Sequence, residues 1–251
     1  MNSTERDFSN NEFNWAAIYD YYEIELRQLY NGIARGQNLS HFEMIKSRAK
    51  EYLNKNKIFC EIGFGSGVTL RLASHYFKTV SGLDISEKNV TLTKQELLNE
   101  GINNAELNYS NIMIYEEKYK NSFDVISLIH GLEHFSTSDY PVLFENIKSY
   151  LREEGIFTGA LPYKLPFNFR MCPHCNKIFE LDGHISSHDL DSIKKEFIDN
   201  GFKIIHLSNF NKRYTQKTEG FLKYSYKKIR SILKNEPLTG QIEFIVQKEK
   251  F

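Results

Sequence analysis

Residues 58–67, with the sequence IFCEIGFGSG, constrain the fold more than any other segment of the chain. An apolar stretch of strand length carries Glu61 near its end, and three alternating glycines then lead into a helical pattern. Glycine lets the backbone approach a ligand closely and adopt positive φ, and a turn at a helix start directs free N–H groups towards a polar ligand. The segment therefore predicts a nucleoside-binding turn after the first strand of an α/β domain.

A second apolar stretch, residues 79–83, ends in Asp84 fewer than twenty positions after Gly67. An acidic side chain at that place can accept hydrogen bonds from both ribose hydroxyls. The dinucleotide fingerprint GxGxxG would require glycine at position 68, where the chain has Val68. The order of motifs resembles the class I S-adenosylmethionine (SAM)-dependent methyltransferases, whose first motif is an acidic residue followed by GxGxG.

The resemblance continues to about residue 162. Residues 123–134 resemble the fourth strand of that family and the LEH segment after it, and residues 150–157 resemble the end of a helix and the fifth strand. In the second segment Glu153 and Glu154 replace the usual Pro-Gly pair, and Gly155 remains to turn the chain. The resemblance implies an α/β fold with a doubly wound, mostly parallel seven-stranded sheet, Rossmann-like, with N-terminal helices and a small Cys/His insertion.

Hydrophobic periodicity agrees with this fold. Helices are expected near residues 66–76, 87–100, 140–151 and 190–200, and later strands near 105–109, 125–128, 156–161, 203–207 and 241–247. Open α/β sheets bind ligands at the carboxyl ends of their strands. Glu61, Asp84, Asn111 and His130 all fall at such ends, so we expect them along one edge of the sheet.

The resemblance assigns SAM to this edge, residue by residue. Glu61 would lie near the cofactor amino group, and Asp84 would hold the ribose. Asn111 replaces an aspartate that commonly binds the adenine amine, and its amide oxygen can accept the same hydrogen bond. The complete predicted cofactor set is Glu61, Gly63, Gly65, Gly67, Asp84, Ile85, Asn111 and Ile112.

His130 and His134 are the candidate catalytic residues, since both follow the fourth strand where the acceptor approaches. Methyl transfer from a sulfonium is an in-line displacement that needs positioning and, for some acceptors, a base. An imidazole can take up a proton near neutral pH. Either histidine could be that base, or His134 could only pack or hydrogen-bond beneath the cofactor.

An insertion at 162–188 carries a CxxC pair, Cys172 and Cys175, followed by His184 and His188 in an HxxxH spacing. These ligand types suit tetrahedral zinc, and His174 is an alternative fourth ligand. Four protein ligands would leave no open position, so a zinc ion here would be structural. The alternative is a CxxC turn with free thiols and surface histidines. The segment resembles an insertion in methyltransferases associated with bacterial surface-polysaccharide biosynthesis.

The remaining segments flank this core. Residues 1–53 predict an N-terminal helical lid, with Tyr19, Tyr21 and Tyr22 as candidate lid residues, or helices that merely cover a sheet edge. Residues 54–251 form the methyltransferase domain. A second insertion, 211–239, is basic with apolar residues at near-helical spacing. It predicts an amphipathic helix that packs against the domain or contacts an anionic substrate or a membrane surface.

Composition sets limits on function. The chain has 32 basic and 32 acidic residues, so the basic field typical of nucleic-acid binding is missing, and 41% hydrophobic residues suffice for a core. No signal sequence or spanning segment is evident, which makes a cytoplasmic enzyme the expectation. The resemblance favours O-methylation of a sugar, a sugar nucleotide or a phosphorylated precursor of capsule or lipopolysaccharide. The alternatives are a quinone or lipid-precursor O-methyltransferase and an RNA-binding or RNA-methylating zinc-knuckle protein.

Overall fold

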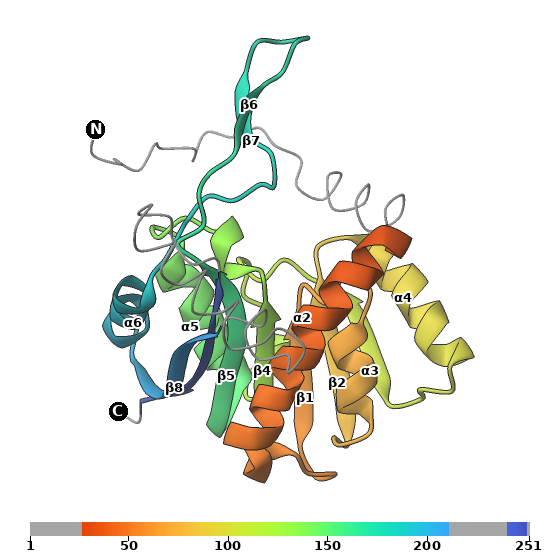
Figure 1. Ribbon diagram of the computed structural model, residues 1–251. Coiled ribbons are helices and arrows are strands. Elements are labelled where there is room, and N and C mark those ends of the chain that lie inside the picture. Colours follow the sequence, from red (N-terminus) through yellow and green to blue (C-terminus); the bar gives the residue numbers. More distant parts are fainter. Residues whose placement is uncertain (1–26, 211–239, 250–251) are drawn as a thin grey trace, which may run out of the picture.

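The computed structural model describes residues 27–210 and 240–249 (Figure 1). The strands of the main sheet are β1 (Ile58–Ile62), β2 (Thr79–Asp84), β3 (Ala105–Tyr109), β4 (Phe123–Ile129), β5 (Leu151–Tyr163), β8 (Phe202–Phe210) and β9 (Gly240–Lys248). Their order is β3-β2-β1-β4-β5-β9-β8. β9 runs antiparallel to both neighbours, and the other pairs are parallel. The predicted doubly wound, mostly parallel seven-stranded sheet is therefore confirmed.

The helices alternate with these strands. They are α2 (Arg27–Arg48), α3 (Val68–Ser74), α4 (Glu87–Asn99), α5 (Tyr140–Tyr150) and α6 (Leu190–Asp199), with 3-10 turns η1 (Lys50–Tyr52), η2 (Glu117–Tyr119) and η3 (Leu132–His134). α3 begins two residues later than expected, because Gly67 before it has a left-handed φ of 70°. The Ser86 side chain caps α4 by accepting from Asn89 N at 3.0 Å, which fixes the helix start directly after β2.

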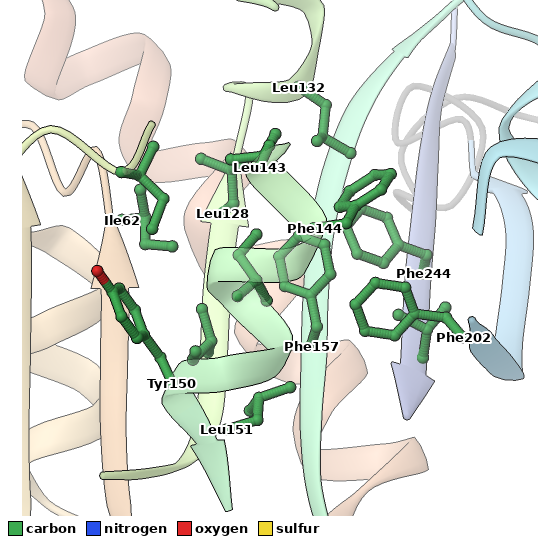
Figure 2. Packing of buried hydrophobic residues seen from close by; sticks show 14 of the residues in the cluster. Ile62, Leu128, Leu132, Leu143, Phe144, Tyr150, Leu151, Phe157, Phe202 and Phe244 are labelled. Carbon is green, nitrogen blue, oxygen red and sulfur yellow. The ribbon is translucent and has the colours of Figure 1, made fainter. Parts of the chain in front are cut away.

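Apolar side chains cover both faces of the sheet. Figure 2 shows the cluster on the side of α5, where Phe144, Phe157 and Phe244 pack together. The opposite cluster includes Phe42 and Ile45 from α2. Burying one such side chain contributes roughly 1.5–3 kcal/mol. Strands buried on both faces are therefore expected to hold a rigid edge where ligands bind.

The order of the strands reverses at β1, which lies between β2 and β4. A ligand crevice forms at such a switch point, outside the carboxyl ends of the strands. The insertion after β5 leaves from that same edge. It forms a two-stranded hairpin of β6 (Phe169–Met171) and β7 (Ile178–Glu180), which projects beyond the sheet (Figure 1).

Two predicted features lie outside the described residues. They are the amphipathic helix at 211–239 and the lid tyrosines Tyr19, Tyr21 and Tyr22. From the N-terminal segment, α2 is described, and its Phe42 and Ile45 are buried against the sheet. Of the helices in the described ranges, none is long and apolar enough to cross a membrane.

Candidate functional site

The glycine turn between β1 and α3 is held in left-handed conformations at Gly63, Gly65 and Gly67, with φ of 62°, 49° and 70°. Gly63 N donates to Leu83 O at 2.8 Å, and Thr93 Oγ1 donates to Gly65 O at 3.1 Å. A Cβ placed on Gly63 would meet no atom within 4 Å. The turn is therefore fixed from behind by β2 and α4, while Gly63 borders space that a ligand could enter.

Glu61 ends the buried part of β1 directly before this turn. Its side chain is 2% exposed, and burial, together with the charge of Asp84, raises its pKa to about 8. Among the described residues Glu61 Oε2 has no hydrogen-bond partner. A buried carboxylate in this state is stabilised by a cationic donor. The resemblance to the methyltransferases places the ammonium group of SAM here, and this role of Glu61 stays a prediction.

Asp84 lies at the end of β2, one position beyond the pairing of Ile62 with Leu83. Its Oδ1 accepts from Ser86 N at 2.9 Å and its Oδ2 accepts from Asn89 Nδ2 at 3.0 Å. These bonds orient the carboxylate rigidly. Because a carboxylate offers about four lone-pair sites, it can still accept from the hydroxyls of a ribose.

The predicted adenine-binding segment follows β3. Asn111 Oδ1 accepts from Met113 N at 3.0 Å, which closes a tight local turn. Ile112 is 6% exposed, and its carbonyl accepts from Asn146 Nδ2 at 2.7 Å. Ile85 is half-buried immediately after Asp84. The backbone of this segment is thus anchored, and the roles of Ile85, Asn111 and Ile112 towards an adenine ring stay predictions.

The turn after β4 carries both candidate catalytic histidines. His130 has a left-handed φ of 52°, uncommon for a residue with a side chain. Its Nδ1 lies 3.3 Å from Oε1 of Glu133, which is 2% exposed. Burial acts to raise the pKa of Glu133, but the hydrogen bond and charge of His130 outweigh it and the pKa is lowered. Glu133 is therefore a buried carboxylate that stays charged beside His130.

The insertion folds back onto this turn. Ile185 N and Ser186 N both donate to Glu133 O, at 2.7 and 3.1 Å. The rings of His134 and His184 lie side by side, with centroids 5.1 Å apart. Burial lowers the pKa of His184, and the nearby His134 adds to this. His184 of the insertion thereby lies beside His134 of the turn after β4.

The structure brings Cys172 and Cys175 together, but His184 and His188 do not converge with them. Cys172 and Cys175 lie in the turn between β6 and β7, where backbone N–H groups of Cys175 and then His174 lower the pKa of the Cys172 thiol. His188 is 3% exposed instead, and its Nε2 lies 2.8 Å from the Tyr140 hydroxyl. Within the described ranges, no convergent group of metal-ligand atoms contains either cysteine or His188.

The physical reason is the conformation of the insertion. The segment from Gly183 to His188 is not helical, and its residues bond to Glu133 and to Lys164 instead of to each other. Residues four apart meet on one face only in a helix, whereas extended chain separates them by roughly 13 Å. His184 and His188 consequently face different neighbours. Zinc binding by Cys172 and Cys175 stays a prediction.

Sequence reasoning missed His41 and Glu133. His41, on α2, is fully buried, and burial, helped by the charge of His130, lowers its pKa to about 3. Its Nε2 lies 3.4 Å from the Thr158 hydroxyl on β5. Only its position beside Phe42 in an apolar stripe could have drawn attention to it. Glu133 stands in the LEH segment, where the neighbouring histidine is the more familiar catalytic type.

Comparisons with known proteins agree with the fold. A SAM-dependent methyltransferase from Clostridium acetobutylicum superposes with a TM-score of 0.63 and 14% identity, over 90% of this chain and 98% of that one. The DhpI complex with SAH gives 0.64 and 13% identity, over 94% and 96%. The [4+2]-cyclase SpnF gives 0.66 and 12% identity, over 94% and 96%. At such identities these structures show the fold, which the cyclase shares.

No curated protein gives a significant match to the chain. The model of a family described as a methyltransferase domain matches residues 39–207, more than half of the sequence. That range extends from α2 to β8 and includes the glycine turn, Asp84 and the turn after β4. The chain therefore belongs to the methyltransferase domain family, the class I SAM-dependent enzymes that its glycine turn and Asp84 predict.

Proposed function

We propose that this methyltransferase transfers a methyl group from SAM to an oxygen of a small polar acceptor. The acceptor class is a sugar, a sugar nucleotide or a phosphorylated precursor of capsule or lipopolysaccharide. The donor side of the proposal rests on Glu61, whose buried Oε2 lacks a partner among the described residues, and on the open space in front of Gly63. An ammonium group beside Glu61 would stabilise the charged carboxylate.

One observation carries the choice of a polar acceptor. Three buried side-chain atoms around the turn after β4 have no hydrogen-bond partner in the described part of the chain: His41 Nδ1, His130 Nε2 and Glu133 Oε2. Each buried polar atom left in that state costs about 1–3 kcal/mol. A ligand rich in hydroxyl groups would satisfy these atoms, whereas an apolar ring would leave them unpaired.

The chemistry assigned to these residues is positioning and proton removal. SAM supplies an electrophilic methyl group on a sulfonium when bound. A histidine accepts the proton of the acceptor hydroxyl; the oxygen bonds to the methyl carbon, and the carbon–sulfur pair stays on sulfur, which gives SAH. His134 Nδ1 lies 3.0 Å from the Gly183 carbonyl and therefore carries a hydrogen. Nε2 is then the nitrogen of His134 that could accept a proton.

The test is a mass-spectrometric screen with two forms of SAM. Pools of nucleotide sugars and phosphorylated metabolites are incubated with the protein and either ordinary or methyl-deuterated SAM. The expected result is one species that gains a methyl group and shows the deuterium shift. Asp84→Asn is the matched control, because it keeps the side-chain size but weakens ribose binding. A product that also forms with equal yield in this variant, or no product in any polar pool, contradicts the proposal.

The base is tested separately by single-turnover methyl transfer with His130→Gln and His134→Gln. Loss of about 100-fold or more in one variant identifies the base, in line with usual effects of acid–base groups. Full activity in both variants excludes a histidine base. Binding of SAH to each variant serves as the control that the donor site is intact.

A second acceptor class has support from the surface of the insertion. The large apolar residues exposed around the β6–β7 hairpin are Phe167, Phe169, Met171, Ile178 and Leu181. Such a patch on a small hairpin favours contact with an apolar partner, as a quinone or lipid-precursor O-methyltransferase would make. Co-sedimentation with phospholipid vesicles distinguishes the two: binding that Phe169→Ser and Met171→Ser abolish favours the lipid acceptor, and absence of binding favours the polar one.

A further inference from the structure

Glu133, His134 and His184 converge at the carboxyl end of β4. Each of the three offers one oxygen or nitrogen atom, and these atoms lie within 4.8 Å of one another. Glu133 and His134 belong to η3, while His184 comes from the insertion about fifty residues later. Two imidazoles and one carboxylate form the ligand set of many three-ligand transition-metal sites.

The carboxylate of this cluster lacks a partner for one of its two oxygens. Glu133 is 2% exposed, and His130 Nδ1 lies 3.3 Å from Oε1, but Oε2 is buried without a hydrogen bond among the described residues. A charged oxygen in that state is costly unless a cation or donor faces it. A metal ion coordinated by Glu133 would remove this cost, since it supplies the opposite charge.

His134 is oriented as a metal-ligating histidine usually is, and His184 has a carboxylate near its second ring nitrogen. A ligating histidine commonly donates its second ring N–H to a carbonyl or carboxylate, which fixes the ring and its tautomer. His134 Nδ1 lies 3.0 Å from the Gly183 carbonyl, so this nitrogen donates and Nε2 carries the lone pair. The Glu180 carboxylate lies near His184, with Oε2 3.8 Å from Nδ1, which is beyond hydrogen-bond distance.

A second group of candidate ligands, Glu180, Asp182 and His184, shares His184 with the first. The oxygens of Glu180 are already used by the backbone: Oε1 accepts from Asn168 N at 2.9 Å, and Oε2 accepts from Asp182 N at 2.9 Å and His184 N at 2.8 Å. Asp182 is exposed to solvent. Glu180 therefore shapes the loop, and the buried Glu133 is the carboxylate better suited to a metal.

We propose that Glu133, His134 and His184 bind one divalent transition-metal ion of the zinc type, separate from the CxxC turn. Three protein ligands leave at least one coordination position open. Hydroxyl or phosphate oxygens of the acceptor would occupy it, because such ions bind oxygen ligands readily. This role deepens the proposed function and rests on it, and it leaves His130 as the base, because the lone pair of His134 Nε2 would bind the metal. Metal binding itself does not require methyl transfer.

The test uses the full-length protein, purified without a histidine tag and stripped with a chelator. Zn²⁺, Mn²⁺ and Co²⁺ are each titrated by calorimetry into the wild type and into Glu133→Gln, His134→Ala and His184→Ala. The expected result is one equivalent bound to the wild type, with affinity lowered at least about 100-fold in each variant, which exceeds the usual effect of removing an outer partner. SAH binding and circular dichroism confirm that the variants fold.

Three control variants separate this site from its alternatives. Cys172→Ser/Cys175→Ser removes the thiols, Asp182→Asn removes the competing carboxylate, and His75→Ala removes an exposed histidine at the far end of α3. All three are expected to keep the wild-type affinity. The Co²⁺ complex should also lack the sulfur-to-metal charge-transfer band that a thiolate ligand produces.

Several outcomes would overturn the assignment. They are no metal binding to the wild type, loss of binding in the cysteine or Asp182 variant, a thiolate band with Co²⁺, or unchanged affinity in Glu133→Gln. Failure of the methyltransferase proposal looks different: the metal would bind as described, but SAH would not bind and no acceptor would be methylated. The two conclusions can therefore be tested independently.

Discussion

Replacing Glu61 with glutamine is expected to stabilise the ligand-free protein, and more strongly as pH rises. The pKa of Glu61 is raised from 4.5 to about 8, mainly by burial. Between pH 4.5 and about pH 8, Glu61 is therefore protonated in the folded chain and ionised in the unfolded chain. Its stabilising contribution is present below pH 4.5 and is lost as pH rises through 8. At about 1.4 kcal/mol per pKa unit, the loss between about pH 5.5 and 7.5 is roughly 2–3 kcal/mol.

His41 would hide this effect in the wild type alone. Burial lowers its pKa from 6.5 to about 3, so its stabilising contribution is present above pH 6.5 and is lost as pH falls towards 3. Between the ordinary pKa values of the two groups, the contributions of Glu61 and His41 change with pH in opposite directions. The difference between wild type and Glu61→Gln cancels His41 and isolates Glu61.

The assay is urea denaturation of both proteins without ligand at about pH 5.5 and 7.5. The free energy of unfolding of Glu61→Gln should exceed that of wild type, and the excess should grow by roughly 2–3 kcal/mol between these pH values. Glu43→Gln, at an exposed site on α2, is the matched control and should show no such growth. Saturating SAM should shrink the gap, because its ammonium group stabilises the charged form of Glu61. A gap that is constant with pH would refute the reasoning.

Three other substitutions have defined outcomes in urea denaturation and SAH calorimetry. Gly67→Ala forces a side chain into φ +70° with its Cβ 2.8 Å from Thr93 Cγ2, so stability should fall by about 1–3 kcal/mol. Gly63→Ala, at φ +62° with no atom within 4 Å, should lose only about 1–2 kcal/mol but weaken SAH binding. Tyr140→Phe removes the hydroxyl 2.8 Å from His188 Nε2 and should cost about 1–3 kcal/mol with SAH affinity unchanged. A larger stability loss in Gly63→Ala than in Gly67→Ala, or unchanged stability in Tyr140→Phe, would contradict these assignments.

The strands and the glycine turn around the proposed SAM site could be predicted from the sequence because their determinants are local. Residues 79–83 and 105–109 are short apolar or alternating runs bounded by turn residues, and they form β2 and β3 almost as expected. The glycine turn depends on backbone conformations that only glycine adopts easily, so the residue type itself reveals the structure. Even the late start of α3 follows from the conformation of Gly67.

The predicted pairing of His184 and His188 as zinc ligands depends on contacts that the local sequence does not determine. The spacing of His184 and His188 would let both side chains bind one metal ion if the intervening residues formed a helix. Those residues instead extend across the turn after β4, and His188 becomes a buried partner of Tyr140. Nothing in the three intervening residues distinguishes these conformations, because the bonds that select one of them are made to residues about fifty positions away.

The insertion and the turn after β4, which form the proposed acceptor site, are held together largely by backbone hydrogen bonds. Glu133 O accepts from two amides of the insertion, and the Gly183 carbonyl accepts from His134. Backbone groups are present at every position, so these bonds cannot be predicted from residue types, although they help to bring His184 beside His134. A change in the length of the insertion is therefore expected to displace His184 and to alter the proposed acceptor site, while SAM binding at the glycine turn and Asp84, as proposed, should persist. Differences in acceptor among chains with this fold are expected in the insertion rather than in the donor motif.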